Sequence, residues 1–178
     1  MNIAFILLLS LTGLLMPRAR EQTPERVTFT SNLPELNRGF DWAKEQALAY
    51  VFEGDPVGKW FEAALPGREA FCMRDVSHQS MGALALGLEE HLANMFGKFA
   101  AAIAPSRDWA SYWEIDRYDR PAPVDYRSDE DFWYNLPANF DVVRAMHGAY
   151  EWTGEEAYLE DPDFREFYRR SLTAYGNS

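Results

Sequence analysis

Two short stretches of this sequence combine carboxylate, arginine and aromatic side chains. They read WEIDRY, beginning at residue 113, and DFWYN, beginning at residue 131. Aromatic rings stack on the apolar face of a sugar, and arginine and carboxylate groups form hydrogen bonds with its hydroxyls. Hydrolysis of a glycosidic bond further needs two carboxyl groups, one acting as an acid and the other as a base or nucleophile. Glu114, Asp116 and Asp131 are therefore candidate catalytic residues for carbohydrate chemistry.

Both stretches lie in an unusual segment that runs from residue 105 to residue 135. It contains three prolines, eight aromatic residues and eight acidic residues. A connection this long inside a compact domain is usually functional or disordered, and the aromatic content argues against disorder. We expect a long aromatic loop that forms part of a site. A structural alternative stays open, in which the rings cover the ends of helices and the acids face water.

A third candidate is the pair Arg74 and Asp75, which precedes a run rich in glycine and alanine. Asp75 suits the N-cap of a helix, which would leave Arg74 to pair with a surface acid. In a functional interpretation, the helix N-terminus orients the carboxylate, and the two side chains bind adjacent sugar hydroxyls. The small residues would let the helix pack closely and hold the pair rigid. Spacing alone does not choose between the two interpretations.

Two longer stretches resemble a known superfamily. MRDVSHQSMGALALGL, which begins at Met73, resembles the Arg-Asp motif at the start of an inner helix in six-hairpin, (α/α)6-barrel glycosidases. AYEWTGEEAYLEDPDFREFYRRSLTAY, which ends at Tyr175, is similar to the hairpin turn that recurs in the same superfamily. The resemblance covers roughly residues 39 to 175. It implies that Arg74 and Asp75 bind the sugar at the cleavage subsite and are not the acid and base.

The expected function follows from this resemblance. We expect a carbohydrate-active protein that resembles a glycoside hydrolase and acts on an oligosaccharide or polysaccharide. The predicted helices are too few to close a barrel, so the chain corresponds to an N-terminal portion of such an enzyme. The expected substrate-binding residues are Arg74, Asp75, His78, Trp113, Arg117, Trp133, Tyr134 and Asn135.

Two alternatives to glycoside hydrolysis remain open. The first is a glycan-binding protein without an acid and base. The second is a polysaccharide lyase on a related helical toroid, in which tyrosine or histidine removes a proton and arginine or asparagine neutralises a uronate.

Other chemistries find little support in the sequence. His78, His91 and His147 belong to no HExxH or CxxC pattern, so we predict no metal site. There is no GxSxG motif and no glycine-rich phosphate loop, so we predict no cofactor. His147 falls on the apolar face of its helix and is expected to be a core histidine.

Apolar residues recur with helical spacing through most of the chain. Helices are expected over residues 41–52, 75–85, 88–103 and 137–153, and from residue 162 to about residue 175. Gly87 and Gly154 are expected to end two of them, and Asp161 with Pro162 to begin the last. No sustained alternation of apolar and polar residues predicts a strand. The predicted fold is therefore all-α, with antiparallel helical hairpins forming part of an (α/α)6 toroid.

The N-terminus predicts export. Residues 3–16 form an apolar run of signal-peptide length that turns abruptly polar. We expect a signal peptide over residues 1–19, a linker over 20–38 and the helical domain over 39–178. The expected location is secreted or periplasmic, with no membrane association beyond export.

Composition limits the partners. The net charge is −11 with a pI of about 4.7, which repels phosphate backbones, so nucleic acid is not an expected partner. The single cysteine, Cys72, excludes an internal disulfide and is expected to be a small buried side chain. The sequence carries no signal for oligomeric state.

Overall fold

The computed structural model describes residues 27–64 and 67–175, so the expected signal peptide lies outside the described residues. Along the chain the elements are α1 (Pro34–Ala49), β1 (Val51–Asp55), β2 (Gly58–Phe61), β3 (Ala70–Cys72), α2 (Met73–Ala85), α3 (Glu89–Ala101), η1 (Pro105–Arg107), β4 (Glu114–Asp116), β5 (Tyr126–Ser128), β6 (Asp131–Phe132), α4 (Ala138–Thr153), α5 (Ala157–Glu160) and α6 (Pro162–Thr173).

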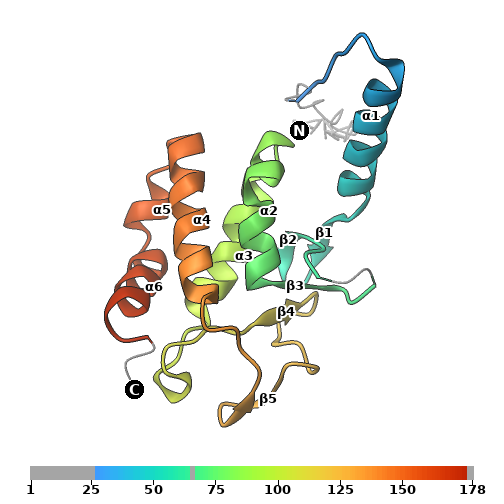
Figure 1. Cartoon of the computed structure of the whole chain (residues 1–178). Coiled ribbons are helices and arrows are strands. Elements are labelled where there is room, and N and C mark those ends of the chain that lie inside the picture. The colour runs from blue at the N-terminus through green and yellow to red at the C-terminus, as the bar shows by residue number, and fades with distance from the viewer. Residues whose placement is uncertain (1–26, 65–66, 176–178) are drawn as a thin grey trace, which may run out of the picture.

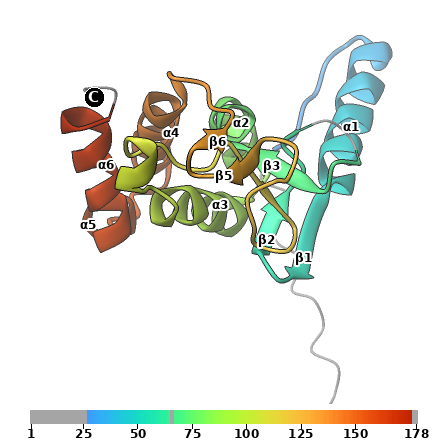
Figure 2. The same ribbon diagram turned by 90° about the horizontal axis from the view of Figure 1, so that it is seen from below.

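Helices α2, α3, α4 and α6 pack together as the body of the molecule (Figure 1, and from below in Figure 2). α2 lies beside α4, and α3 packs against α2, α6 and strand β2. Their apolar faces enclose one core, whose largest fully buried side chains include Trp60, Phe71, Phe96, Phe99 and Phe167. Burying each of these side chains stabilises the fold by about 1.5 to 3 kcal/mol. The core therefore fixes the helices, and with them the helix ends that carry the site.

The all-α prediction is wrong, because the fold is mixed. It contains three two-stranded antiparallel sheets, formed by β1 with β2, β3 with β4, and β5 with β6. The strands are only two to five residues long, too short to produce an alternating pattern. At the β1–β2 turn, Gly54 and Gly58 have φ angles of 93° and 97°, which favour glycine. The sequence analysis predicted no strand in this region, only that the helix over residues 41–52 ends before it.

The assignment to six-hairpin glycosidases is also wrong. An (α/α)6 toroid is built from successive helical hairpins joined by short turns. Here strands β1 to β3 separate α1 from α2, and strands β4 to β6 separate α3 from α4. The described residues therefore form a mixed α/β fold with three small sheets and no helical toroid.

Most helix boundaries follow the predicted capping chemistry. Gly87 and Gly154 have φ angles of 80° and 71°, the left-handed conformation that ends a helix. The Asp161 carboxylate accepts the amides of Asp163 and Phe164 and so caps α6. The N-cap of α2 is Cys72 and not Asp75, which instead lies in the first helical turn.

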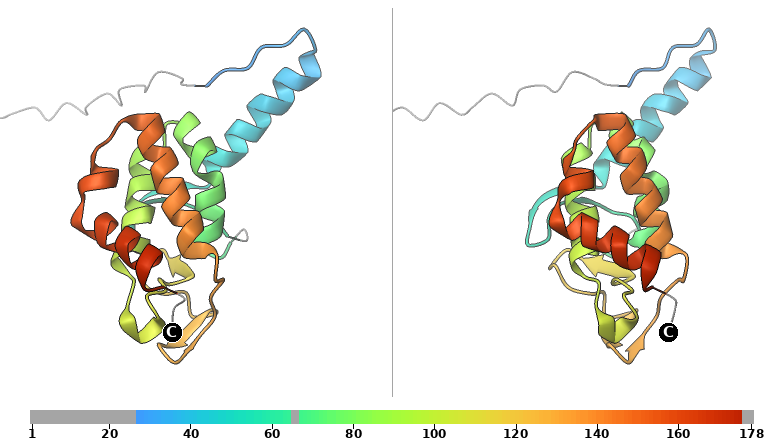
Figure 3. Two further views of the ribbon diagram at one scale, coloured as in Figure 1. Left: turned by 60° about the vertical axis from the view of Figure 1, so that its left-hand side comes forward. Right: turned by 90° about the vertical axis from the view of Figure 1, so that its left-hand side faces the viewer.

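Helix α1 projects from the body (Figure 3). It begins at Pro34, earlier than the expected Asp41, and the rest of the described chain buries none of its residues. Phe40 packs against Phe29, with ring centroids 5.4 Å apart. Among the described residues, no helix combines the length and apolar character needed to cross a membrane.

Candidate functional site

The N-terminal ends of α2 and α4 lie next to each other, and the predicted residue Arg74 lies there (Figure 1). Arg74 Nε is 3.9 Å from Asp141 Oδ2 on α4. Asp141 Oδ2 is buried and has no hydrogen-bond partner within the described part of the chain. Since buried polar atoms are normally satisfied, this oxygen has unused capacity to accept a hydrogen bond.

A polar groove extends from this point between the two helices, and we call it the α2–α4 groove. Its volume is about 510 Å³. It is lined by Ser77, His78, Ser80, Met81, Asp141, Arg144, Ala145, His147, Gly148 and Glu151. The lining carries charges of both signs together with hydroxyls. Such a surface suits a ligand that both donates and accepts hydrogen bonds.

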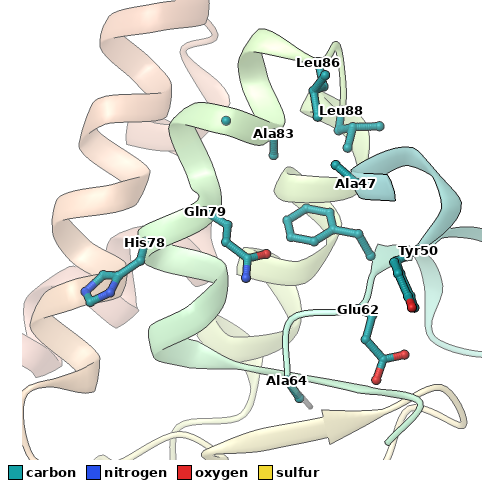
Figure 4. Close-up of a pocket in the computed structure, with 11 residues that line it drawn as sticks. Ala47, Tyr50, Glu62, Ala64, His78, Gln79, Ala83, Leu86 and Leu88 are labelled. Atoms are coloured by element: carbon teal, nitrogen blue, oxygen red, sulfur yellow. The ribbon is translucent and has the colours of Figure 1, made fainter. Parts of the chain in front are cut away.

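The two histidines of the groove come from opposite walls. In Figure 4, His78 points from α2 toward α4. The His147 side chain is 60% exposed, and its Nδ1 is 3.5 Å from Glu151 Oε2. The prediction of a core histidine is therefore wrong for His147. Asp141, Arg144, Gly148 and Glu151 follow helical spacing on one face, a polar stripe that the sequence analysis could have found.

A second pocket of about 440 Å³ opens on the other side of α2, and its lining is largely apolar (Figure 4). Ala83, Leu86 and Leu88 lie on one side of it and Tyr50 on the other. Phe61 also lines this pocket. Of the predicted site residues only His78 borders this pocket, and its ring points away. The direction of the His78 ring and the position of Arg74 beside Asp141 therefore favour the α2–α4 groove.

The aromatic residues predicted to bind sugar lie near the start of α2. Trp113 and Trp133 form an edge-to-face pair with ring centroids 4.7 Å apart. The Met73 amide donates to the Trp113 carbonyl at 3.0 Å, which fixes this pair next to α2. Trp133 is 52% exposed, so its indole face is available for stacking.

Tyr134 has a structural role. Its hydroxyl donates to the Oδ1 atom of Asn139 and lies 3.1 Å from Met73 Sδ. Burial raises the pKa of the Tyr134 hydroxyl well above its usual value. The sequence could not distinguish this tyrosine from an exposed one, because its partner Asn139 lies on a separate element.

Asp75 is exposed and accepts a hydrogen bond from the Cys72 thiol. In the first turn of α2, its negative charge interacts favourably with the positive end of the helix dipole. Cys72 is buried, as predicted. The two side chains connect the start of α2 to the β3–β4 ribbon.

Cys72 is expected to be unreactive in the folded protein. Burial, together with the hydrogen bond to Asp75, raises the pKa of the thiol to about 12, and only the thiolate is nucleophilic. Titration with Ellman's reagent at pH 8 should detect almost no thiol before denaturation and one equivalent after it. Rapid labelling of the native protein would contradict the buried hydrogen bond.

Glu114 lies in β4 and is 2% exposed. It pairs with Cys72 across the ribbon. Arg68 donates to Glu114 Oε2, and the same guanidinium lies 3.3 Å from Asp125 Oδ2. Burial, followed by a hydrogen bond to Asp125, raises the pKa of Glu114 to about 8. Glu114 is therefore largely protonated at neutral pH, which is unusual for a carboxyl group and frequent at functional sites.

A cavity of about 470 Å³ adjoins Glu114, and we call it the β4 cavity. It is lined by Arg68, Glu69, Ala70, Glu114, Asp116, Arg117, Tyr118, Ala122, Pro123 and Val124. Asp116 accepts the backbone amides of Tyr118 and Arg120 and is bridged by the Arg120 guanidinium at 2.8 Å. The cavity thus contains two of the three predicted carboxyl candidates.

The remaining predicted residues are dispersed. Arg117 is held by Asp55 at 2.7 Å and by Glu69, and it borders the β4 cavity. Asp131 is exposed and pairs with Arg127 at 3.2 Å. Asn135 lies in the turn before α4, where its carbonyl accepts the Ala138 amide. Of the predicted residues, His78 lines the α2–α4 groove, and Glu114, Asp116 and Arg117 line the β4 cavity. The other predicted residues line neither.

No group of three or more His, Cys, Asp and Glu side chains in the described ranges could hold a metal ion. No protein-family model matches the chain, and neither a curated protein nor a solved structure matches it.

Proposed function

We propose that this protein is carbohydrate-active and binds an oligosaccharide or polysaccharide at the N-terminal end of the α2–α4 groove. The observation that supports this most directly is the unsatisfied Asp141 Oδ2, buried beside Arg74 and close to the edge-to-face tryptophan pair. A sugar hydroxyl can donate to Asp141 while accepting from Arg74. Adjacent sugar hydroxyls suit this pair, because one hydroxyl can accept from the arginine while its neighbour donates to the carboxylate.

The charge of the groove favours a neutral ligand. Asp141 and Glu151 supply two negative charges to its lining. Arg144 in the lining and Arg74 beside Asp141 supply two positive charges. The two carboxylates would repel a strongly anionic ligand, and the two arginines would repel a strongly cationic one. A neutral glycan meets none and can use both donors and acceptors. This balance favours hydrolysis or binding over the lyase alternative, whose uronate substrate needs an excess of positive charge.

The exposed indole of Trp133 supplies the apolar contact. A pyranose presents a face of C–H groups that stacks on an aromatic ring, and stacked aromatic contacts contribute about 0.5 to 1.5 kcal/mol beyond the area they bury. Trp113, held against Met73, keeps Trp133 in place through their edge-to-face contact. The two tryptophans would therefore also report on binding through their fluorescence.

Removing the Arg74 guanidinium should weaken glycan binding about tenfold or more, since a hydrogen bond to a charged group contributes about 1.5 to 3 kcal/mol. The measurement is titration of tryptophan fluorescence with cello-, xylo-, manno- and malto-oligosaccharides for the wild type and Arg74→Ala. Asp141→Asn should produce a loss of similar size, because its amide nitrogen donates where the carboxylate accepted.

Arg38→Ala is the matched control for this experiment. Arg38 is exposed on α1, far from the groove, and lies 3.9 Å from Glu35. Its substitution should leave every affinity unchanged. The proposal fails if no sugar in the panel changes the fluorescence of the wild type, or if Arg74→Ala and Arg38→Ala bind equally well.

The same panel distinguishes the three classes of carbohydrate protein. New reducing ends indicate hydrolysis, ultraviolet absorbance from a new double bond indicates a lyase, and binding without turnover indicates a binding protein. Export, proposed from the apolar N-terminal run of residues 3–16, is tested separately by fractionating cells that express the full chain.

A further inference from the structure

We propose that the projecting helix α1 is a dimerisation element, through which two copies of this chain pair antiparallel. Each copy then fills the apolar pocket of about 440 Å³ at the base of the other copy's α1, which we call the α1 pocket. This inference goes beyond glycan binding, because it concerns a part of the molecule on the other side of α2 from the α2–α4 groove.

Helix α1 lacks the contacts that normally stabilise a helix (Figure 3). It has 16 residues, none of which is buried by the rest of the described chain. Its N-cap residue, Leu33, makes no capping hydrogen bond with its side chain, and Gly39 in its interior lowers its helix propensity. Isolated helices of about this length are marginal in water and depend on packing of an apolar face. We therefore expect another surface to cover α1.

The face that needs covering is a regular apolar stripe. Its residues follow one another alternately three and four positions apart, the spacing of a seam between two paired helices. All of them are exposed except Phe40, which is half-buried against Phe29. The stripe consists of Leu33, Leu36, Phe40, Ala43, Ala47 and Tyr50. Its spacing indicates a second helix as the occupant.

The stripe ends in the α1 pocket. Ala47 and Tyr50 belong both to the stripe and to the lining of this pocket, where Figure 4 shows them across from Leu86 and Leu88. The pocket is largely apolar. A helix seated along the stripe would therefore place its last apolar side chains in the pocket.

The side-chain sizes of α1 match those of an antiparallel second copy. A two-fold axis between residues 41 and 42 brings Phe40 opposite Ala43, Leu36 opposite Ala47 and Leu33 opposite Tyr50. Two of these layers place a large side chain against a small one, and the two leucines of the second copy reach the α1 pocket. Because the axis is two-fold, the same contacts form twice. A parallel pair would place Phe40 against Phe40 and would bring no leucine to the pocket.

Charge also favours the antiparallel arrangement. The chain carries a net charge of −11, but α1 contains three acidic and two basic residues, so nearly all of this charge belongs to the rest of the chain. Antiparallel helices would keep the two acidic bodies about 24 Å apart, the length of α1. This distance is about three Debye lengths at physiological ionic strength. Parallel helices would place the two bodies side by side.

The expected dimer is weak. Two helices about 24 Å long and about 10 Å wide, with one small pocket each, form a contact below the roughly 1,600 Å² of a standard interface. The dimer should therefore dissociate on dilution in the micromolar range.

The test measures association of the full chain by sedimentation equilibrium between about 1 and 100 µM, the range expected for a contact of this size. Ala43→Glu places an unpaired charge against Phe40 of the second copy and should weaken dimerisation at least about tenfold. The far-ultraviolet helix signal of the wild type should decrease on dilution, because α1 loses its cover. Ala43→Glu should show the lower signal throughout.

Ala49→Glu is the matched control, since it makes the same change on the opposite face of the same helix. It should dimerise like the wild type. The proposal fails if the wild type is monomeric over the whole range, or if the two variants associate equally well. The second result would show that the copies meet through another surface.

Disulfide cross-linking tests the direction of pairing. Leu36→Cys combined with Ala47→Cys should form a covalent dimer on mild oxidation, because these positions face each other only in an antiparallel pair. The two positions lie too far apart on one helix to join within a copy, and the native Cys72 is buried. Cross-linking of either single variant to the same extent would indicate parallel helices and overturn the proposal.

Discussion

Replacing Glu114 with glutamine is expected to stabilise the protein, and the gain should increase as the pH rises. In the folded state the pKa of Glu114 is about 8, raised chiefly by burial, whereas its ordinary value is 4.5. The unfolded chain therefore loses this proton several pH units earlier than the folded chain. Between these two values the unfolded state is favoured progressively, because it alone can ionise the carboxyl without a desolvation penalty.

The sign of the effect follows from the direction of the shift. Below pH 4.5 both states hold the proton, so the wild type retains its full stability. As the pH rises through 8, that stability is lost, by about 1.4 kcal/mol for each unit of pKa difference. Glutamine keeps the shape of the protonated carboxyl and does not titrate. The variant should therefore exceed the wild type by a few kcal/mol at pH 9 and by little at pH 4.

Urea denaturation of the wild type and Glu114→Gln at pH 4, 7 and 9 measures this difference. Glu130→Gln, an exposed glutamate of the same segment, is the control and should show no trend with pH. A constant difference between Glu114→Gln and the wild type at all three pH values would show that Glu114 ionises normally. The raised pKa that burial gives this carboxyl would then be wrong.

The sequence could name candidate side chains but not how the fold groups them. Arg74 and His78 lie on α2, and the Trp113 carbonyl accepts the Met73 amide next to them. Asp141 was missed, because its proximity to Arg74 depends on the packing of α2 against α4. No local pattern encodes that contact.

The fold shows the same limit. Helix ends marked by Gly87, Gly154 and Asp161 were predicted correctly, since capping depends on a few neighbouring residues. The β3–β4 ribbon was missed, because it pairs Ala70 with Asp116 and Cys72 with Glu114 from distant parts of the chain. Each strand has only three residues, so no window of sequence contains the pattern.

Replacing Asn139 with alanine is expected to lower the free energy of unfolding by about 2 to 4 kcal/mol. The side chain is fully buried in α4. Its Nδ2 donates to the Trp109 carbonyl at 3.1 Å and to Ser171 Oγ on α6 at 2.9 Å, while Oδ1 accepts from Tyr134. Alanine leaves these partners buried without their bonds, and the penalty for unsatisfied buried groups exceeds the net gain from making them.

Tyr134→Phe is the matched comparison, because it removes one of these bonds and leaves the amide contacts of Asn139 in place. It should cost about 1 kcal/mol in the same urea titration. Asn139→Ala should also weaken the near-ultraviolet dichroism of the Trp113–Trp133 pair, since the 105–135 segment loses its attachment to α4. Equal costs for the two variants would show that Asn139 does not join α4, α6 and this segment, and that the aromatic part of the site is held by other contacts.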